Sequence, residues 1–356
     1  MKLGKISISS IKDISLVKKA INYNTWLLCG NNPKKQALFK KILLKKCNSI
    51  TVVPSDTLLH GSNGVRGYCC ADADQNFDVV FWGNQGSPNE KGTIHTAVHE
   101  MCHAVQHVAS YILKNPGDDY VFGNHVMSTH GSTIIEKSGN DRFSDAYGTF
   151  FCETITDILT NVELFYLDKK FIDRRINADN ILKYNYSILD GSNMQKFGYT
   201  IYLSIARLAI AAFSNVGSVS YDKIIQNGES IILAKNTRNE PVNDLLYGIM
   251  CNALYIENAY DKYMGNNAYY KLCKKLDYML NHPLKNADVK EVMCELAVFQ
   301  NKKVNDLLAR NVITQKEATF MINDFNLVFN NLQCEYDAYL TTKDMKKIVK
   351  SSNKAS

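Results

Sequence analysis

Apolar residues recur at the 3.6-residue spacing of an amphipathic helix between Gly92 and Ala109. A second stretch, from Tyr147 through Asn161, repeats this spacing. The apolar stripe of the first helix consists of Ile94, Ala97, Val98, Met101, Val105 and Val108, and that of the second of Phe151, Ile155, Ile158, Leu159, Val162 and Phe165. We expect two helices, each buried along its apolar stripe.

Short β-favouring runs precede the first helix. Ile50–Val53 and Val65–Ala71 are bounded by turn-forming residues, and Phe77–Trp82 is a strongly β-favouring apolar run. These runs predict a small sheet whose last hairpin leads into the first helix through the segment 83–92. The sequence leaves open which strand forms the edge of the sheet.

The second half of the chain is predicted to be almost wholly helical from Glu163 to Thr341. The segment from Tyr111 to Ala146 is rich in Gly, Asn, Asp and Ser, which predicts a long irregular loop. We expect this loop to lie near a substrate-binding cleft. We expect the helical part to form a lobe that closes one wall of that cleft, with a separate partner-binding module as the alternative. The predicted helical runs are Gln195–Ser214, Val242–Tyr263, Ala268–Leu280, Asp288–Asn301, Val304–Ala309 and Ile313–Leu332.

The first helix carries an H-E-x-x-H pattern at His99, Glu100 and His103. Residues four apart on a helix lie one above the other, about 6 Å apart, so the two imidazoles can bind one metal ion. Glu100, next to the first histidine, can take a proton from a metal-activated water. This pattern is typical of a zinc hydrolase.

Two further histidines, His95 and His107, lie in register with the first pair. They could form the pairs His95/His99 and His103/His107. In neither pair is the first histidine followed by glutamate, since Thr96 follows His95 and Ala104 follows His103. We therefore expect His95 and His107 to be solvated or to lie outside the ligand shell.

A catalytic zinc site needs a third protein ligand and one open position. The metzincin arrangement is excluded, because Gln106 and Ala109 occupy the positions where it requires glycine and histidine. The predicted second helix presents Glu153 and Asp157 together on the face opposite its apolar stripe.

These motifs resemble the gluzincin branch of the zincin metallopeptidases, in which a glutamate on a following helix completes H-E-x-x-H. The resemblance covers about a tenth of the chain, on two short helices. It implies that Glu153 is the third ligand and that Asp157 orients His99 from outside the ligand shell. The 49 residues between His103 and Glu153 are nearer to the spacing of lethal-factor-like toxin peptidases than to that of thermolysin-like enzymes.

Two further residues are candidates for the site. Asp145, followed closely by Tyr147-Gly148, resembles the aspzincin signature with one residue too few, and is the alternative third ligand. Tyr147, upstream of Glu153, is a candidate donor to the developing oxyanion, as in the lethal-factor-like group. Its alternative role is that of an ordinary tyrosine among 20.

Composition and charge indicate what kind of protein carries these motifs. The 356 residues are 46% hydrophobic and 21% charged, which indicates a folded chain of two or three subdomains. Ten cysteines without a C-x-x-C pair indicate free thiols, and no secretory signal or membrane-spanning run is evident, so we expect a cytoplasmic protein. The net charge of +6 includes a basic amphipathic stretch, Lys34–Lys46, which we interpret as a solvated face with no nucleic-acid partner.

The sequence thus predicts an α+β protein with a zincin-like catalytic core and a mainly α-helical C-terminal lobe. Its expected parts are an N-terminal helical segment (1–49), the core (50–165), the lobe (166–342) and a flexible tail (343–356). The expected activity is hydrolysis of peptide or protein substrates with one zinc ion as cofactor. The alternatives are a catalytically inactive zincin-fold binding protein and a host-targeted toxin protease with a single substrate.

Overall fold

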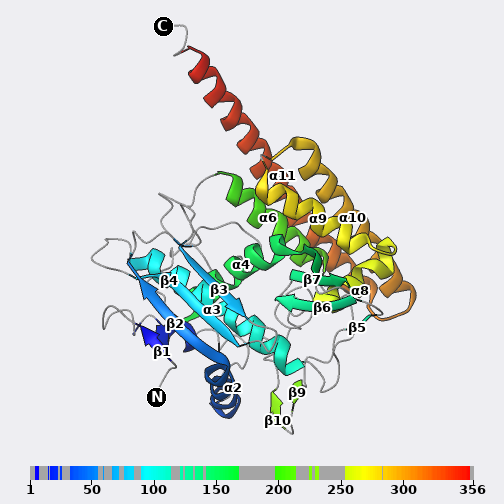
Figure 1. Ribbon diagram of the computed structural model, residues 1–356. Helices are drawn as coiled ribbons and strands as arrows, with labels where there is room; N and C mark the ends of the chain where they lie inside the picture. Colours follow the sequence, from blue (N-terminus) through cyan, green and yellow to red (C-terminus); the bar gives the residue numbers. More distant parts are fainter. Residues whose placement is uncertain are drawn as a thin grey trace.

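The computed structural model describes residues 5–7, 15, 17–22, 25, 33–54, 59, 66–71, 76–83, 90–113, 121–122, 125–130, 133–138, 142–167, 197–213, 224–226, 229–231, 253–282 and 284–352. Over these residues the fold is a mixed α+β arrangement, mostly helical, with small sheets (Figure 1). The predicted α+β class is confirmed at this level. No helix in the described ranges combines the length and apolarity needed to cross a bilayer.

The first sheet contains all three predicted strands. Its order is β1 (Lys5–Ser7), β2 (Cys47–Val53), β4 (Phe77–Trp82) and β3 (Gly67–Ala71). The first three are parallel, whereas β3 pairs antiparallel with β4 alone. Among the described strands, β3 is therefore the edge nearest the predicted ligand helix, which the sequence could not show. β1 also places a strand in the N-terminal segment that was predicted to be helical.

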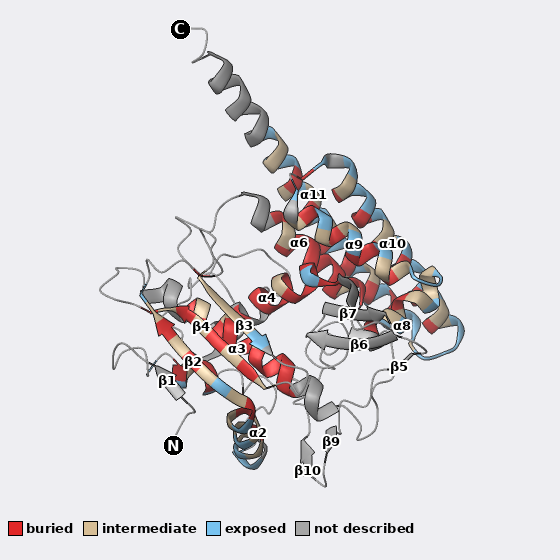
Figure 2. Cartoon of the chain, viewed as in Figure 1, coloured by how far each residue is buried: buried red, intermediate tan, exposed pale blue. Residues whose placement is uncertain are grey.

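Alternating burial explains how this sheet packs. In β4 every second residue is buried, as a half-buried strand requires. The buried side chains form one cluster with the apolar stripe of α3 (Glu90–Leu113), which packs against β3 and β4 (Figure 2). α2 (Pro33–Lys46) contacts both β2 and α3, and its buried Phe39 and Leu43 belong to the same cluster. The buried sheet residues are Ile50, Val52, Phe77, Val79 and Phe81.

The two predicted amphipathic helices are present. α3 extends the predicted range by a few residues at each end, and α4 (Thr149–Leu167) packs directly against it. Tyr147 and Gly148 lie outside α4, since Tyr147 ends a strand and Gly148 has a φ of 90°. The second helix thus begins two residues later than predicted.

The prediction of an irregular segment from Tyr111 to Ala146 is wrong. These residues form an antiparallel sheet in the order β5 (Val121–Phe122), β6 (His125–His130), β7 (Thr133–Ser138) and β8 (Arg142–Tyr147). Each of the three longer strands spans only six residues. A composition typical of loops therefore concealed four consecutive antiparallel strands.

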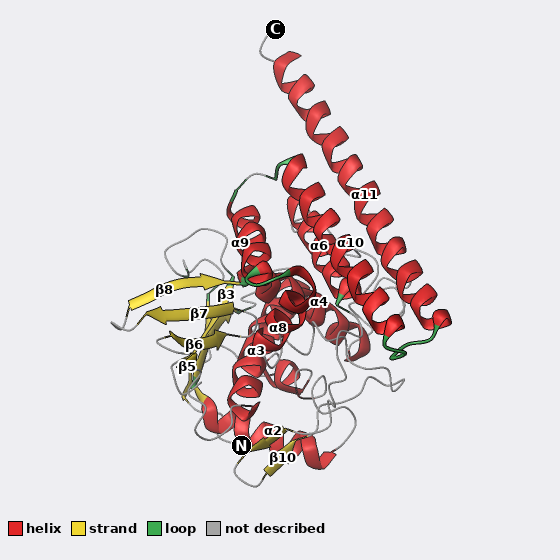
Figure 3. Ribbon diagram, turned by 90° about the vertical axis from the view of Figure 1, so that its right-hand side faces the viewer, coloured by secondary structure: helices red, strands yellow, loops and turns green. Residues whose placement is uncertain are grey.

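The helical lobe consists of α6 (Phe197–Ala212), α8 (Ala253–Met264), α9 (Ala268–Asn281), α10 (Asn286–Ala309) and α11 (Gln315–Ser352). Figure 3 shows α6, α10 and α11 running alongside one another, with α11 projecting beyond the rest. The second half was predicted to be almost wholly helical, and its described residues are helical apart from short turns and one hairpin. Residues 168–196, 214–223 and 232–252, which include the start of the predicted run Val242–Tyr263, lie outside the described part of the structure.

The helical lobe differs from the sequence predictions in the following three ways. The helical runs predicted at Asp288–Asn301 and Val304–Ala309 are a single helix, α10. α11 continues through Ser352, so residues 343–352 are helical where a flexible tail was predicted. A hairpin of β9 (Ile224–Gln226) and β10 (Glu229–Ile231) interrupts the part that was predicted to be wholly helical.

One cluster of buried side chains joins the sheet to the lobe. It includes Phe81 of β4, Met101 of α3, Ile155 of α4, Leu208 of α6 and Leu296 of α10. Continuous burial of this kind is what makes two parts of a chain one cooperative body. The lobe is thus packed onto the predicted ligand helices, and the predicted boundary at residue 166 marks no break in the core.

Candidate metal centre

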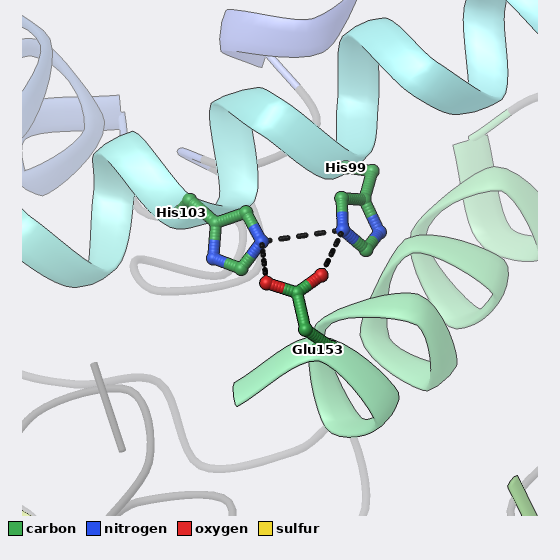
Figure 4. Close-up of side chains that lie close together, drawn as sticks. All are labelled: His99, His103 and Glu153. Carbon is green, nitrogen blue, oxygen red and sulfur yellow. Dashed lines mark hydrogen bonds and ion pairs between the residues drawn. The ribbon is translucent and has the colours of Figure 1, made fainter. Parts of the chain in front are cut away.

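Three side chains from the two adjacent helices converge on one point. His99 and His103 lie one turn apart on α3, and their Nε2 atoms are 3.2 Å from each other. Glu153 of α4 faces them, with Oε2 3.5 Å from His99 Nε2 and Oε1 3.7 Å from His103 Nε2 (Figure 4). The sequence-predicted ligands are therefore brought together, although 49 residues separate the second histidine from the glutamate.

The spacing of these atoms suits a metal ion. A tetrahedral zinc ion with bonds of 2.0 to 2.1 Å has ligand atoms about 3.3 Å apart. The two Nε2 atoms are 3.2 Å apart, close to that value, and each lies 3.5 or 3.7 Å from a different oxygen of the Glu153 carboxylate. Two imidazole nitrogens and one carboxylate oxygen within 4.8 Å of one another could thus hold a metal ion. Geometry alone does not select zinc among the metals that accept such ligands.

The electrostatics of the three residues also favour a cation. Burial lowers the pKa of His99, but its hydrogen bond to Glu153 and nearby acids raise the pKa above the usual range. Desolvation raises the pKa of Glu153, but attraction to His103 and hydrogen bonds from both histidines lower it by more. The negative charge that favours a proton between these groups also favours a metal cation. The Glu153 side chain is 47% exposed, whereas those of His99 and His103 are 13% and 12% exposed, so the group is reached from the Glu153 side.

Asp157 lies one turn beyond Glu153 and is buried between two histidines. Its Oδ1 is 3.2 Å from His95 Nε2 and 3.8 Å from His99 Nδ1. The aspartate therefore lies on the far side of the His99 ring, as the resemblance implied, but its nearer partner is His95. A carboxylate in this position fixes the tautomer and orientation of a ligand histidine.

His95 and His107 are both buried, so neither is a solvated histidine. His95 belongs to the group around Asp157, which agrees with the prediction of a residue outside the ligand shell. Burial raises the pKa of Asp157, but His95 first, and then His99 and the buried Arg207 of α6, lower it by more. The ionised form of Asp157 is thereby favoured.

A buried polar bridge holds α3 and α4 in register. Gln106 Nε2 donates to Thr156 Oγ1 over 2.6 Å, and Cys152 Sγ lies 3.8 Å from Gln106 Oε1. The same sulfur lies 3.7 Å from His103 Nδ1, on the side of the ring away from Glu153. These contacts orient His103 much as Asp157 orients His99. In the sequence, Gln106 served only to exclude the metzincin arrangement, and Cys152 was one of ten cysteines expected to be free thiols.

Glu100 is 7% exposed and lies against the edge strand. A Cβ atom added to Gly67 of β3 would be 2.7 Å from Glu100 Cγ and 2.8 Å from Glu100 Oε1. Only glycine allows the strand to approach this carboxylate so closely. An isolated glycine within a strand pattern marks a close backbone approach, so Gly67 is a position that the sequence could have indicated.

Tyr147 and Asp145 remain predictions. The Tyr147 hydroxyl donates to the carboxylate of Glu257 on α8, over 3.2 and 3.3 Å, and its ring packs edge-on against Tyr270. This contact gives Tyr147 a structural partner and leaves the oxyanion role untested. Asp145 lies in β8 opposite Glu136, but its side chain is outside the described part of the structure.

Comparison with known proteins identifies no relative. No family model, no curated protein sequence and no solved structure matches this chain. The function is therefore inferred from the chemistry and geometry of the site itself.

Proposed function

We propose that this protein is a zinc-dependent peptidase of the gluzincin type. One observation carries the proposal: the two histidines of H-E-x-x-H converge with Glu153 of the next helix, so that one ligand atom from each residue lies within 4.8 Å of the others. The edge strand lying against Glu100 supports a zincin-like core, because that arrangement places a binding surface beside the proposed base.

His99, His103 and Glu153 would hold the ion. Two imidazoles and one carboxylate are a ligand set of catalytic zinc sites, in which a fourth position stays open. A zinc ion held by these residues would supply Lewis-acid polarisation of a substrate carbonyl and a bound water of lowered pKa. Asp157, through His99, and Cys152, through His103, orient the ligand rings.

Glu100 is the proposed general base. It takes a proton from the attacking water and delivers it to the nitrogen of the leaving amine. Burial raises the pKa of Glu100, while His99 and His103 lower it by less. A raised pKa suits a carboxyl that must accept a proton and then give it up near neutral pH.

The proposed substrate is a peptide segment in extended conformation. Among the described strands β3 pairs with β4 alone, and an extended peptide could add to this edge of the sheet. A peptide bound along β3 would pass beside Glu100, since Gly67 contacts that residue. This arrangement would bring a scissile bond to the base and the metal ligands together.

Removal and restoration of the metal test this proposal. The purified protein should contain close to one zinc ion per chain and should cleave at least one member of a peptide library. A chelator should abolish cleavage, and added zinc should restore it, as measured by mass spectrometry of the products. Bound zinc without any cleavage would favour the inactive binding protein, and cleavage that survives full metal removal would contradict the proposal.

Gly67→Ala should reduce turnover without loss of metal. The added methyl group must displace the Glu100 side chain, whose Cγ it would meet at 2.7 Å. A displacement of about 1 Å at a catalytic group costs on the order of 100-fold in rate. Steady-state kinetics and metal content are the measurements, with Cys70→Ala, at an exposed position on the same strand, as the control. A Gly67→Ala variant with wild-type kcat would show that β3 does not position Glu100.

A further inference from the structure

The helix that carries Glu153 begins without a capping side chain of its own. The residue before α4 is Gly148, whose φ of 90° suits glycine and which has no side-chain acceptor. The first backbone N–H groups of a helix have no partner within the helix. The first bond of α4 is the one from Cys152 N to Gly148 O, so the preceding N–H groups require an acceptor from elsewhere.

Asp277 of α9 supplies that acceptor. Its Oδ2 accepts from Gly148 N over 2.8 Å, and its Oδ1 accepts from Phe150 N over 2.6 Å. Both oxygens of one carboxylate thus hold the start of α4, although Asp277 lies 129 positions after Gly148 in the sequence. The acceptor comes from the helical lobe.

A second contact from the lobe holds the residue just before this point. The Tyr147 hydroxyl donates to Glu257 of α8, and the Tyr147 ring packs against Tyr270 of α9. Residues 147–150 are thereby fixed by two helices of the lobe. Figure 1 shows α4 between α3 and the helices of the lobe, and it contacts both α3 and α9.

The position of Glu153 depends on where α4 begins. Phe150, held by Asp277, lies three residues before Glu153, which is less than one helical turn. A helical turn is rigid, so a shift of its first residues moves the carboxylate that follows. Metal sites tolerate ligand displacements of only about 0.2 Å, so a small shift changes the affinity for the ion.

We propose that Asp277 is a positioning residue of the metal centre, which holds Glu153 opposite His99 and His103 by fixing the start of α4. Through it the lobe sets the metal affinity of a site to which it contributes no ligand. This inference rests on the proposed metal site and goes beyond it. It makes the helical lobe part of the active centre rather than a separate binding module.

Asp261 provides a matched control within the same lobe. Its Oδ2 accepts from Asn267 N over 2.7 Å and its Oδ1 from Tyr269 N over 2.8 Å, at the start of α9. It therefore makes the same kind of contact as Asp277, at the start of α9 rather than of α4, and Asp277 itself lies more than two turns further along α9. A purely structural effect of losing such a cap would appear in both variants, whereas an effect on the metal should appear in one.

The test measures zinc affinity by competition with a chromophoric chelator in the full-length protein. Asp277→Asn keeps the side-chain volume and one acceptor oxygen, so it should fold and bind zinc about tenfold more weakly. Asp277→Ala should bind more weakly still, and Asp261→Asn should bind as the wild type does. Hydrogen exchange of the metal-free proteins should speed up at residues 148–150 in the Asp277 variants alone.

The outcomes separate the two proposals. If the wild type binds zinc and Asp277→Asn binds it equally well, the positioning role is wrong while the metal site stands. If the wild type binds no zinc, the metal site is wrong, and this inference with it. An equal loss of affinity in Asp261→Asn would also overturn the inference, because it would reflect general destabilisation.

Discussion

Replacing Glu100 with glutamine is expected to lower peptide hydrolysis by about 10²- to 10⁴-fold, the usual contribution of a general base. Glutamine has nearly the same shape, so it should occupy the space between α3 and Gly67 that the glutamate fills. It cannot accept a proton from water. The metal ligands His99 and His103 are untouched, so the variant should retain its zinc. The measurements are kcat/KM on the best library peptide and metal content per chain.

A surface variant provides the control for this experiment. Glu291→Gln changes the same functional group at a side chain that is 63% exposed and pairs with Lys275, and it should leave both quantities unchanged. If Glu100→Gln hydrolysed peptides at the wild-type rate, Glu100 would not be the base. A loss of zinc in that variant would instead indicate a structural role for its carboxylate.

Glu153→Ala should lose metal affinity by more than about 100-fold. Loss of a residue outside the ligand shell costs 10- to 100-fold, and removal of a ligand should cost more. The alanine also leaves His99 and His103, 3.2 Å apart, without the negative charge that faces them. Because the side chain of Glu153 is half exposed, the fold should survive its truncation. Competition with a chelator gives the affinity, and thermal unfolding without metal checks the fold.

The same measurement on Asp145→Ala decides between the two candidate ligands. If Glu153 is the third ligand, Asp145→Ala should bind zinc as tightly as the wild type. The opposite pattern, with tight binding in Glu153→Ala and none in Asp145→Ala, would assign the ligand to the strand β8 instead.

The elements around the site could be predicted because each is amphipathic over most of its length. Alternation in β4 and the 3.6-residue spacing in α3 and α4 are local properties, and the structure moves their ends by only a few residues. Prediction failed for β6 to β8, each of which spans only six residues. Short strands carry too few alternating positions to stand out from a polar segment.

The candidate site was predictable in part for the same reason. His99 and His103 meet because residues four apart on a helix share a face, whatever the rest of the fold does. Asp157 was expected beside His99, and the structure places it between His99 and His95, the nearer partner. That difference depends on how α4 is rotated against α3, which a single helix pattern does not contain.

The sequence by itself determined the helix faces, the paired imidazoles and the adjacent acid, because backbone geometry converts spacing along a helix directly into proximity. Only the tertiary structure decided that Glu153 faces both histidines, that Gly67 lies against Glu100 and that Asp277 holds the start of α4. Those contacts join residues on different elements, and they arise from the packing of a shared core. No local pattern specifies which distant residues such a core will bring together.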